Sequence, residues 1–531
     1  MLILQNIAYL HPNKELLFSN INLTVNNHEK LALIGNNGVG KSTLLKIIAG
    51  ALQPSDGQLS IGTKPYYVPQ IFGQYNHLTI AQALRIEDKI NALKAILNGN
   101  VTEANLAILD DDWTIEERCT AALHYWHLEG LDLTQKMETL SGGQKTKVFL
   151  AGISIHQHQF VLLDEPSNHL DTAGRQLLYS FVQSTSSTLM IVSHDRKSLN
   201  LLDTICELSR RGITVYGGNY EFYAVQKEIE NNALNEDIKS TEKALRKAKE
   251  KERETVERQQ KLDARGRKKQ EKAGTPTIML NTLRNNAEKS TSKIKSVHAE
   301  KIGGISQELQ ALRKELPEID KMKFGFDNAA LHKGKILFTA TGINFSYSLQ
   351  SLWNENLNIQ IVSGERVALK GLNGSGKTTL IKIMLGKLEP TTGTVYRAHS
   401  TSVYIDQDYS LIDDRLNVYE QALRFNTSAL QEHEIKIRLS RFLFTKEDWD
   451  KACSALSGGE KMRLMLCCLT ISNQSPDIIV LDEPTNNLDL QNIEILTAAI
   501  NEYQGTLIVV SHDDYFLEQI QVVRTIELSS F

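Results

Sequence analysis

Short apolar runs recur in both ends of the chain, whereas its middle is polar and charged. Residues 31–34, 160–165, 367–370 and 478–483 are the clearest of these runs, and two of them end in a pair of acids. A short continuous run of this kind predicts a central strand of a parallel sheet, buried on both faces. A glycine-rich loop and then a helical segment follow the first and third runs. We therefore expect an α/β fold at each end of the chain.

Residues 220–316 follow a helical pattern instead. No glycine or proline interrupts residues 220–265, which predicts one helix of roughly 70–80 Å at about 1.5 Å per residue. A second polar run follows the break at Gly274-Thr275-Pro276, with Gly303 and Gly304 weakening it near its middle. Apolar or small side chains recur at alternating spacings of four and three: Leu234, Ile238, Thr241, Leu245, Ala248, and then Ile302, Ile305, Leu309, Leu312, Leu316. Two such seams predict an antiparallel helical hairpin whose tip is the turn at residues 275–280.

The two ends of the chain carry the same motifs in the same order. Residues 35–44 return as 371–380, 140–144 as 456–460, 161–171 as 480–489, and 191–195 as 509–513. Four matched motifs separated by about 320–340 residues indicate a duplicated domain. We predict a first domain at 1–218, a hairpin linker at 219–335 and a second domain at 336–531.

The first matched motif is a phosphate-binding loop. It comprises Gly35, Asn36, Asn37, Gly38, Val39, Gly40, Lys41, Ser42 and Thr43 in the first copy, and Gly371, Leu372, Asn373, Gly374, Ser375, Gly376, Lys377, Thr378 and Thr379 in the second. Such a loop presents backbone N–H groups and a helix N-terminus to phosphates. The lysines are expected at the β- and γ-phosphates of ATP, and Ser42 and Thr378 at Mg²⁺. One such motif can arise by chance, but two copies in the same setting exclude that explanation.

Two further motifs supply candidate catalytic groups. Asp164 and Asp482 end apolar strands, at the sheet edge where ligands bind, and are expected to join the Mg²⁺ shell. Glu165 and Glu483 follow them and are the candidates to polarise the attacking water. His194 and His512 follow later strands and are candidates to contact the γ-phosphate.

Charge is unevenly distributed. The chain has a formal net charge of −4, yet residues 258–301 carry 12 Lys/Arg against 4 Asp/Glu, a net of +8. Charge runs are usually solvated helix surface, but a basic pole at the tip of a long hairpin favours a polyanionic target. The sequence has neither a charged and then apolar leader nor an apolar run of 18 residues. We therefore expect neither secretion nor a membrane-spanning segment. The five cysteines lack a C-x-x-C pair, which favours reduced thiols in a cytoplasmic protein.

Together these motifs resemble the ATP-binding cassette superfamily. The residues 140–144 and 456–460 match its signature, with Ser141, Gly142, Gly143, Gln144, Ser457, Gly458, Gly459 and Glu460 expected at nucleotide. The resemblance implies that Gln70 and Gln407 serve the metal as Q-loop glutamines, and that Asp171 and Asp489 are the D-loop aspartates. It also implies that each signature closes on the nucleotide of the other cassette.

The resemblance leaves one position open. The aromatic residue that stacks on adenine in this superfamily matches Tyr347, 24 residues before Gly371. The first cassette has His11 at this spacing and Tyr9 nearby, so its adenine platform is undecided. The carboxylates, histidines and signature serines are intact in both cassettes, so both sites are expected to be competent.

Two cassettes joined by a charged hairpin resemble the ABC-F family of ribosome-associated translation factors. That resemblance implies a cytoplasmic monomer that binds large-subunit rRNA and tRNA, with the hairpin tip approaching the peptidyl-transferase centre. It does not choose between antibiotic resistance, rescue and ribosome assembly. The alternatives are a transporter motor, a DNA-repair ATPase and an adaptor with vestigial activity. About 23 extra residues in the first cassette, near 87–112, are either an arm of the kind some family members carry or a plain surface insertion.

Overall fold

The computed structural model describes residues 1–272, 277–315, 322, 332, 334–347, 350–372, 374–472, 475–486 and 488–529. It divides into two compact units. One contains both cassettes, Met1–Tyr223 with Met322–Phe531, and the other is the hairpin, Ala224–Lys321. None of the described helices combines the length and the apolar character that crossing a membrane requires.

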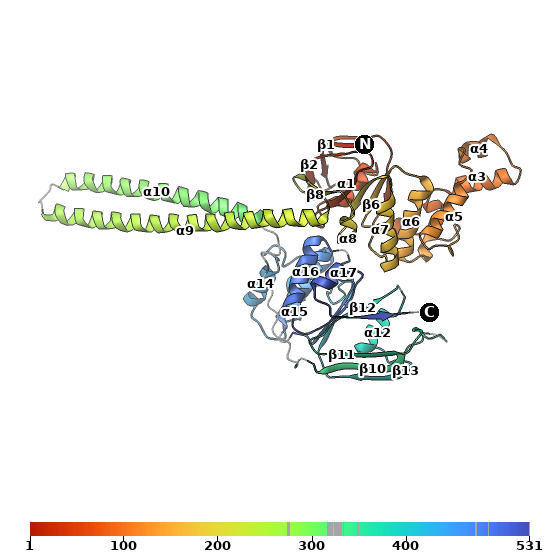
Figure 1. Cartoon of the computed structure of the whole chain (residues 1–531). Coiled ribbons are helices and arrows are strands. Elements are labelled where there is room, and N and C mark those ends of the chain that lie inside the picture. Colours follow the sequence, from red (N-terminus) through yellow and green to blue (C-terminus); the bar gives the residue numbers. More distant parts are fainter. Residues whose placement is uncertain are drawn as a thin grey trace. The chain divides into compact units, whose positions relative to one another are not determined.

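The first cassette is built on a six-stranded sheet (Figure 1). Its strand order is β5 (Tyr66–Val68), β6 (Phe160–Asp164), β7 (Thr188–Val192), β3 (Lys30–Ile34), β8 (Thr204–Ser209) and β9 (Gly212–Gly217). All pairings are parallel except β8 with β9. A smaller antiparallel sheet has the order β2 (Leu16–Val25), β1 (Leu2–Leu10) and β4 (Asp56–Ile61). The helices are α1 (Lys41–Ile48), α2 (Ile80–Ala83), α3 (Glu87–Leu97), α4 (Glu103–Leu109), α5 (Ile115–Tyr125), α6 (Gly142–His156), α7 (Thr172–Ser184) and α8 (Arg196–Leu199).

The second cassette repeats this plan. Its parallel sheet has the order β14 (Ser402–Ile405), β15 (Ile478–Asp482), β16 (Thr506–Val510), β12 (Arg366–Gly371) and β17 (Arg524–Leu528). The antiparallel sheet has the order β11 (Leu357–Val362), β10 (Ile336–Asn344) and β13 (Thr392–Arg397). The helices are α12 (Lys377–Met384), α13 (Val418–Arg424), α14 (Glu432–Arg441), α15 (Gly458–Ile471), α16 (Leu490–Glu502) and α17 (Asp514–Gln519). The predicted α/β fold with two tandem cassettes is confirmed.

The apolar character of the central strands follows from burial on both faces. Leu31 and Leu33 of β3 pack into the core shared with β1, β2 and α1. Ala32 and Ile34, which alternate with them, pack into the core shared with α5 and α6. Successive side chains of a strand point to opposite faces. In a strand covered on both sides all of them are therefore buried, which favours apolar residues at every position.

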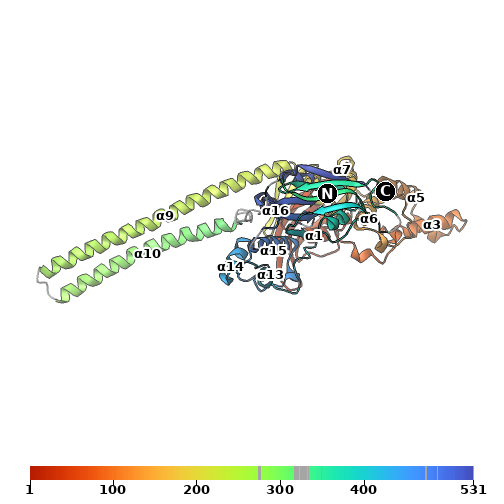
Figure 2. The same ribbon diagram turned by 90° about the horizontal axis from the view of Figure 1, so that it is seen from below.

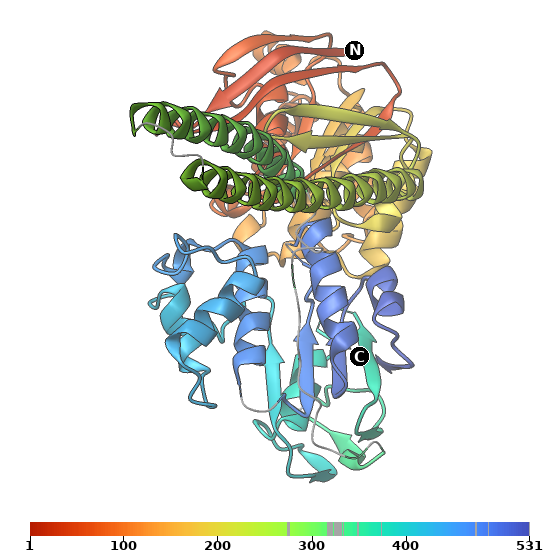
Figure 3. The same ribbon diagram turned by 90° about the vertical axis from the view of Figure 1, so that its left-hand side faces the viewer.

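The hairpin consists of α9 (Tyr220–Lys272) and α10 (Thr277–Glu315), which run side by side in Figures 1 and 2 and appear foreshortened in Figure 3. The predicted seams are its less exposed positions, with Ile238 and Leu309 buried. Arg313 donates to Glu242 across the two helices at 2.6 Å. Leu316, the last predicted seam residue, lies outside the described residues.

One expectation about the hairpin needs correction. Residues 277–280 were expected in the turn, but α10 begins at Thr277, because nothing after Pro276 in the sequence opposes a helix. Gly303 and Gly304 leave α10 unbroken, since packing along a seam outweighs the roughly 1 kcal/mol that each glycine costs relative to alanine. Thr275 and Pro276, and the side chains of residues 266–291 within the basic tip, lie outside the described part of the structure.

The extra segment of the first cassette forms α3 and α4. Ile90, Leu93 and Leu109 from these helices are buried in the cassette's core. Asp112, at the end of this segment, accepts from Arg118 at 2.7 Å and from Lys89 at 3.2 Å. The segment is therefore a pair of helices that pack against the cassette through these residues, and its use as an arm stays a prediction. All five cysteines are buried and unpaired.

Candidate functional site

The phosphate loops lie between a central strand and a helix in both cassettes. After β3, Gly38 and Gly40 adopt φ of 79° and 104°, and after β12, Gly374 and Gly376 adopt 85° and 87°. A side chain at Gly40 would also come within 2.7 Å of the Phe18 ring. Glycine is therefore required there by both conformation and space. The loops lead directly into α1 and α12, whose first N–H groups have no partner within the helix and suit an anion.

Both loop lysines are curled back onto their own loops. Lys41 Nζ donates to the carbonyl oxygens of Gly35 at 2.6 Å and Asn36 at 3.3 Å. Lys377 Nζ donates to those of Gly371 at 2.8 Å and Leu372 at 3.0 Å. Burial lowers the pKa of each lysine, and the neighbouring Glu165 or Glu483 opposes that shift. Each ammonium group thus lies over the concave side of its loop.

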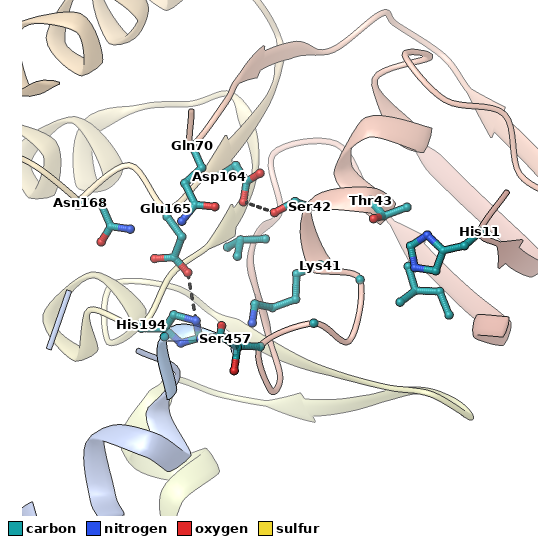
Figure 4. A pocket seen from close by; sticks show the side chains of 16 residues that line it. His11, Lys41, Ser42, Thr43, Gln70, Asp164, Glu165, Asn168, His194 and Ser457 are labelled. Carbon is teal, nitrogen blue, oxygen red and sulfur yellow. Dashed lines mark hydrogen bonds and ion pairs between the residues drawn. The ribbon is translucent and has the colours of Figure 1, made fainter. Parts of the chain in front are cut away.

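The strand-end aspartates meet hydroxyl groups. Asp164 Oδ1 accepts from Ser42 Oγ at 3.0 Å (Figure 4). Asp164 Oδ2 accepts from Tyr67 Oη, also at 3.0 Å. In the second cassette, Asp482 Oδ2 accepts from Tyr404 Oη at 2.7 Å. Burial raises the pKa of both aspartates, and these hydrogen bonds oppose the shift. Two oxygen ligands brought together, a hydroxyl and a carboxylate, form the donor set that Mg²⁺ prefers.

Sequence reasoning missed the two tyrosines. Tyr67 and Tyr404 each stand three residues before the Q-loop glutamine, Gln70 or Gln407. This matched spacing, with each tyrosine in the strand before its glutamine (β5 or β14), is the sequence signal that could have identified them. Because β5 pairs with β6 and β14 with β15, each tyrosine is carried to the aspartate at the end of the neighbouring strand.

Each glutamate after the strand-end aspartate adopts a left-handed backbone. Glu165 has φ of 51° and Glu483 has φ of 48°, which is uncommon outside glycine. Their N–H groups donate to Val192 and Val510 at 2.8 Å, which holds the turn. Within the described residues, Oε1 of each glutamate is buried and accepts no hydrogen bond. Burial raises the pKa of Glu165, and that of Glu483 to about 7.

A histidine faces each of these glutamates. His194 Nε2 lies 3.2 Å from Glu165 Oε1, as Figure 4 shows, and His512 Nε2 lies 3.4 Å from Glu483 Oε1. The three parallel strands β6, β7 and β3 end at the same sheet edge, which brings Asp164, His194 and Lys41 together. Burial lowers the pKa of His194 well below its usual value and that of His512 to about 4, so both rings are neutral near pH 7.

The signature serines cap the helices that follow them. Ser141 Oγ accepts from the N–H of Gln144 at 3.3 Å, and Gln144 Oε1 accepts from the N–H of Ser141 at 2.9 Å. Ser457 and Glu460 form the same reciprocal pair at 3.3 and 2.7 Å. Substituting such a cap costs about 1 kcal/mol, so each signature serine stabilises the start of the helix that follows it.

The first cavity has a volume of about 490 Å³ and contains residues of both cassettes. The predicted site residues that line it are Asn37, Gly38, Gly40, Lys41, Ser42, Thr43, Gln70, Asp164, Glu165, His194, Ser457 and Gly458. Ser457 and Gly458 come from the second cassette. The cassettes also contact each other through a hydrogen bond, which the N–H of Asn37 donates to Asp489 Oδ2 at 2.6 Å. A cavity composed of both cassettes is present at the first phosphate loop.

The second cavity, of about 540 Å³, differs in this respect. The predicted residues that line it are Tyr347, Gly374, Ser375, Gly376, Lys377, Thr378, Thr379, Gln407, Asp482 and Glu483. Residues 141–144 are not among the described residues of this lining, although they were expected to close on it. His512 lies outside the lining too and contacts the first cassette through Thr172 instead. Asn373 lies outside the described residues.

The two cavities also differ at the positions where the resemblance predicts the adenine platform. Tyr347 lines the second cavity and its hydroxyl lies 2.8 Å from Thr379 Oγ1. In the first cavity the lining residue is His11, together with Leu17, whereas Tyr9 packs against Phe18. The structure therefore brings His11, rather than Tyr9, to the position that the sequence left open.

Comparisons with known proteins agree with this architecture. Residues 18–168 and 354–486 each match the ABC transporter family model. The chain is 31% identical to the ATP-binding protein YdiF of Bacillus subtilis, over 97% of this chain and 78% of YdiF. It is 29% identical to ABC transporter F family member 5 of Arabidopsis thaliana, over 94% of this chain and 71% of that protein.

The chain is a tandem-cassette ATPase of the ABC-F type. Its fold is also that of the RNase-L inhibitor, with a TM-score of 0.60 and 20% identity over 98% of this chain and 87% of the other. An archaeal ribosome recycling factor, solved with a ribosomal stalk protein, matches with a TM-score of 0.56 and 19% identity over 97% of this chain and 86% of the other. As an ABC-F ATPase the chain binds and hydrolyses nucleotide.

Proposed function

We propose that this ABC-F ATPase acts in the cytoplasm, as a monomer, on the ribosome. On this proposal it inserts its hairpin towards the peptidyl-transferase centre and frees or modulates stalled translation. The observation that carries the proposal is the excess of 12 Lys/Arg over 4 Asp/Glu in residues 258–301, at the end of a hairpin between two cassettes. A dense positive pole on an otherwise acidic protein suits the phosphate backbone of large-subunit rRNA and tRNA. Insertion of the hairpin towards that centre could also protect the ribosome against antibiotics that bind near it.

Two composite sites would drive this cycle. Lys41 and Lys377 would turn from their loop carbonyls to the β- and γ-phosphates of ATP. Ser42, Gln70 and Asp164, with Thr378, Gln407 and Asp482, would hold Mg²⁺, which neutralises phosphate charge. Residues 141–144 and 457–460 would contact the nucleotide of the opposite cassette.

Hydrolysis would then fall to the glutamates and histidines. Oε1 of Glu165 or Glu483 is buried beside its histidine and accepts no hydrogen bond among the described residues, so it would accept one from the attacking water. Neutral His194 or His512, whose Nε2 lies beside that glutamate, would donate its single N–H to the γ-phosphate. The glutamate positions the water and the lysine stabilises developing charge, so each residue has a separable effect.

Sedimentation through a sucrose cushion tests the ribosome proposal. The full chain is mixed with ribosomes and either a non-hydrolysable ATP analogue, ADP or no nucleotide. We expect co-sedimentation with the analogue and much less with ADP. A chain that stays in the supernatant in every condition would overturn the proposal and leave the transporter-motor and nucleic-acid-repair functions, which binding to a membrane subunit or to duplex DNA would support.

Ser457→Arg should disable the first site selectively. An arginine at this position would occupy the cavity beside Lys41 and leave no room for the phosphates. In a Glu483→Gln background, where turnover comes from the first site, we expect a loss of at least 10-fold in kcat/KM. Ser141→Arg is the matched control, because it removes the same kind of helix cap. Equal losses from both variants would contradict the pairing of Ser457 with Lys41.

A further inference from the structure

The start of α7 contacts the second catalytic centre from the opposite cassette. Thr172 Oγ1 lies 2.9 Å from Nδ1 of His512, the ring whose Nε2 faces Glu483. One turn further along, Arg175 is buried and donates from Nε to the carbonyl oxygen of Leu170 at 3.2 Å. Its guanidinium lowers the pKa of Glu483 against the larger effect of burial. The first cassette thus supplies a hydroxyl and a positive charge to the second centre.

The matching helix of the second cassette supplies neither group. Aligned on the D-loop aspartates Asp171 and Asp489, the counterpart of Thr172 is Leu490 and that of Arg175 is Ile493. Leu490 packs against the apolar core of the first cassette. In keeping with this, Nδ1 of His194 is buried without a hydrogen-bond partner among the described residues. The two catalytic centres are therefore chemically unequal.

The Thr172 contact also selects a form of the His512 ring. Burial keeps this imidazole neutral near pH 7, so one ring nitrogen carries a proton and the other accepts. If the Thr172 hydroxyl donates to Nδ1, the proton is on Nε2, which is the nitrogen directed at the Glu483 carboxylate. The same tautomer presents an N–H donor towards a γ-phosphate. Within the described part of the chain, no hydroxyl contacts Nδ1 of His194 in the same way.

We propose that Thr172 is a positioning residue for His512, and that it makes hydrolysis at the second site depend on contact with the first cassette. The proposal rests on the proposed function, in which His512 and Glu483 serve the second site. In the first site Leu490 replaces this hydroxyl, and among the described residues Nδ1 of His194 has no hydrogen-bond partner that could orient the ring. Loss of the Thr172 contact should consequently reduce ATP turnover at the second site more than at the first.

Thr172→Val tests the proposal in backgrounds with one working site each. Glu165→Gln leaves the second site and Glu483→Gln leaves the first. Loss of one orienting hydrogen bond predicts a reduction of about 5- to 10-fold in kcat, with KM for ATP changed less than two-fold, in the Glu165→Gln protein. In the Glu483→Gln protein the same change is expected to cost less than two-fold. Thr172→Ser, which keeps the hydroxyl, should restore turnover in the Glu165→Gln protein.

A second readout separates orientation from stability. In full-length protein labelled with ¹⁵N-histidine, His512 should show the Nε2–H tautomer, and Thr172→Val should shift it towards a mixture. Equal losses in both backgrounds, or failure of Thr172→Ser to rescue, would overturn the proposal. If neither single glutamate variant lowers turnover, the site assignment itself fails, which is a different result from an inert Thr172.

Discussion

Replacing Glu165 and Glu483 together by glutamine is expected to reduce ATP turnover at least about 100-fold while ATP binding stays within a few-fold of the parent. General-base or water-orienting carboxylates contribute roughly 10²- to 10⁴-fold. The lysine and Ser–Asp groups that would bind phosphate and Mg²⁺ are untouched. The measurements are steady-state phosphate release and equilibrium binding of a fluorescent ATP analogue. Glu117→Gln with Glu447→Gln, at two exposed glutamates, is the matched control.

The same double variant also addresses the ribosome. If hydrolysis releases the protein, the variant should remain on ribosomes in ATP, as the parent does only with a non-hydrolysable analogue. Peptide synthesis in a cell-free extract should then fall as the variant is added. Normal hydrolysis by the double variant would count against the assigned glutamates. Loss of hydrolysis without retention on ribosomes would leave the site intact and count against the ribosomal cycle.

Reversing the charge of Arg265, Arg267, Lys268 and Lys269 to glutamate should weaken ribosome binding by more than 10-fold. Each phosphate contact that is lost should also reduce the slope of log K against log salt by roughly 0.7–0.9. ATPase activity without ribosomes should survive, because these residues belong to the hairpin unit and the catalytic groups to the other unit. Binding is measured by sedimentation or fluorescence anisotropy at several salt concentrations.

Two control variants sharpen this experiment. Lys239, Lys243, Lys247 and Lys251, reversed together, change the same charge on exposed positions of α9 outside the basic tip. We expect them to leave the salt slope nearly unchanged. Ile278, Met279 and Leu280 replaced by alanine keep the first turn of α10 and should spare binding but remove the effect on translation. If the tip variant shows the same slope of log K against log salt as the parent, the basic residues of the tip do not contact phosphates and are solvated helix surface.

The sequence alone determined the architecture of this ATPase. Apolar runs such as residues 160–165 predict strands buried on both faces, and the structure has β6 there. The seams through Ile238 and Leu309 predict a helical hairpin, and α9 and α10 form it. Duplicated motifs predict two phosphate loops at corresponding sheet edges. These features are local, because strand, helix and loop preferences depend on residues a few positions apart.

Only the tertiary structure decided which groups meet. Tyr67 reaches Asp164 across 97 positions, Asn37 reaches Asp489 across 452, and Thr172 reaches His512 across 340. Which residues pair over such separations in the sequence depends on how the sheets and helices pack. A pattern of residues a few positions apart does not predict these pairs. The left-handed backbone of Glu165 is likewise invisible in sequence, because a non-glycine residue adopts it only when its surroundings hold it there. For the same reason, two cassettes with matching motifs still surround His194 and His512 with different side chains.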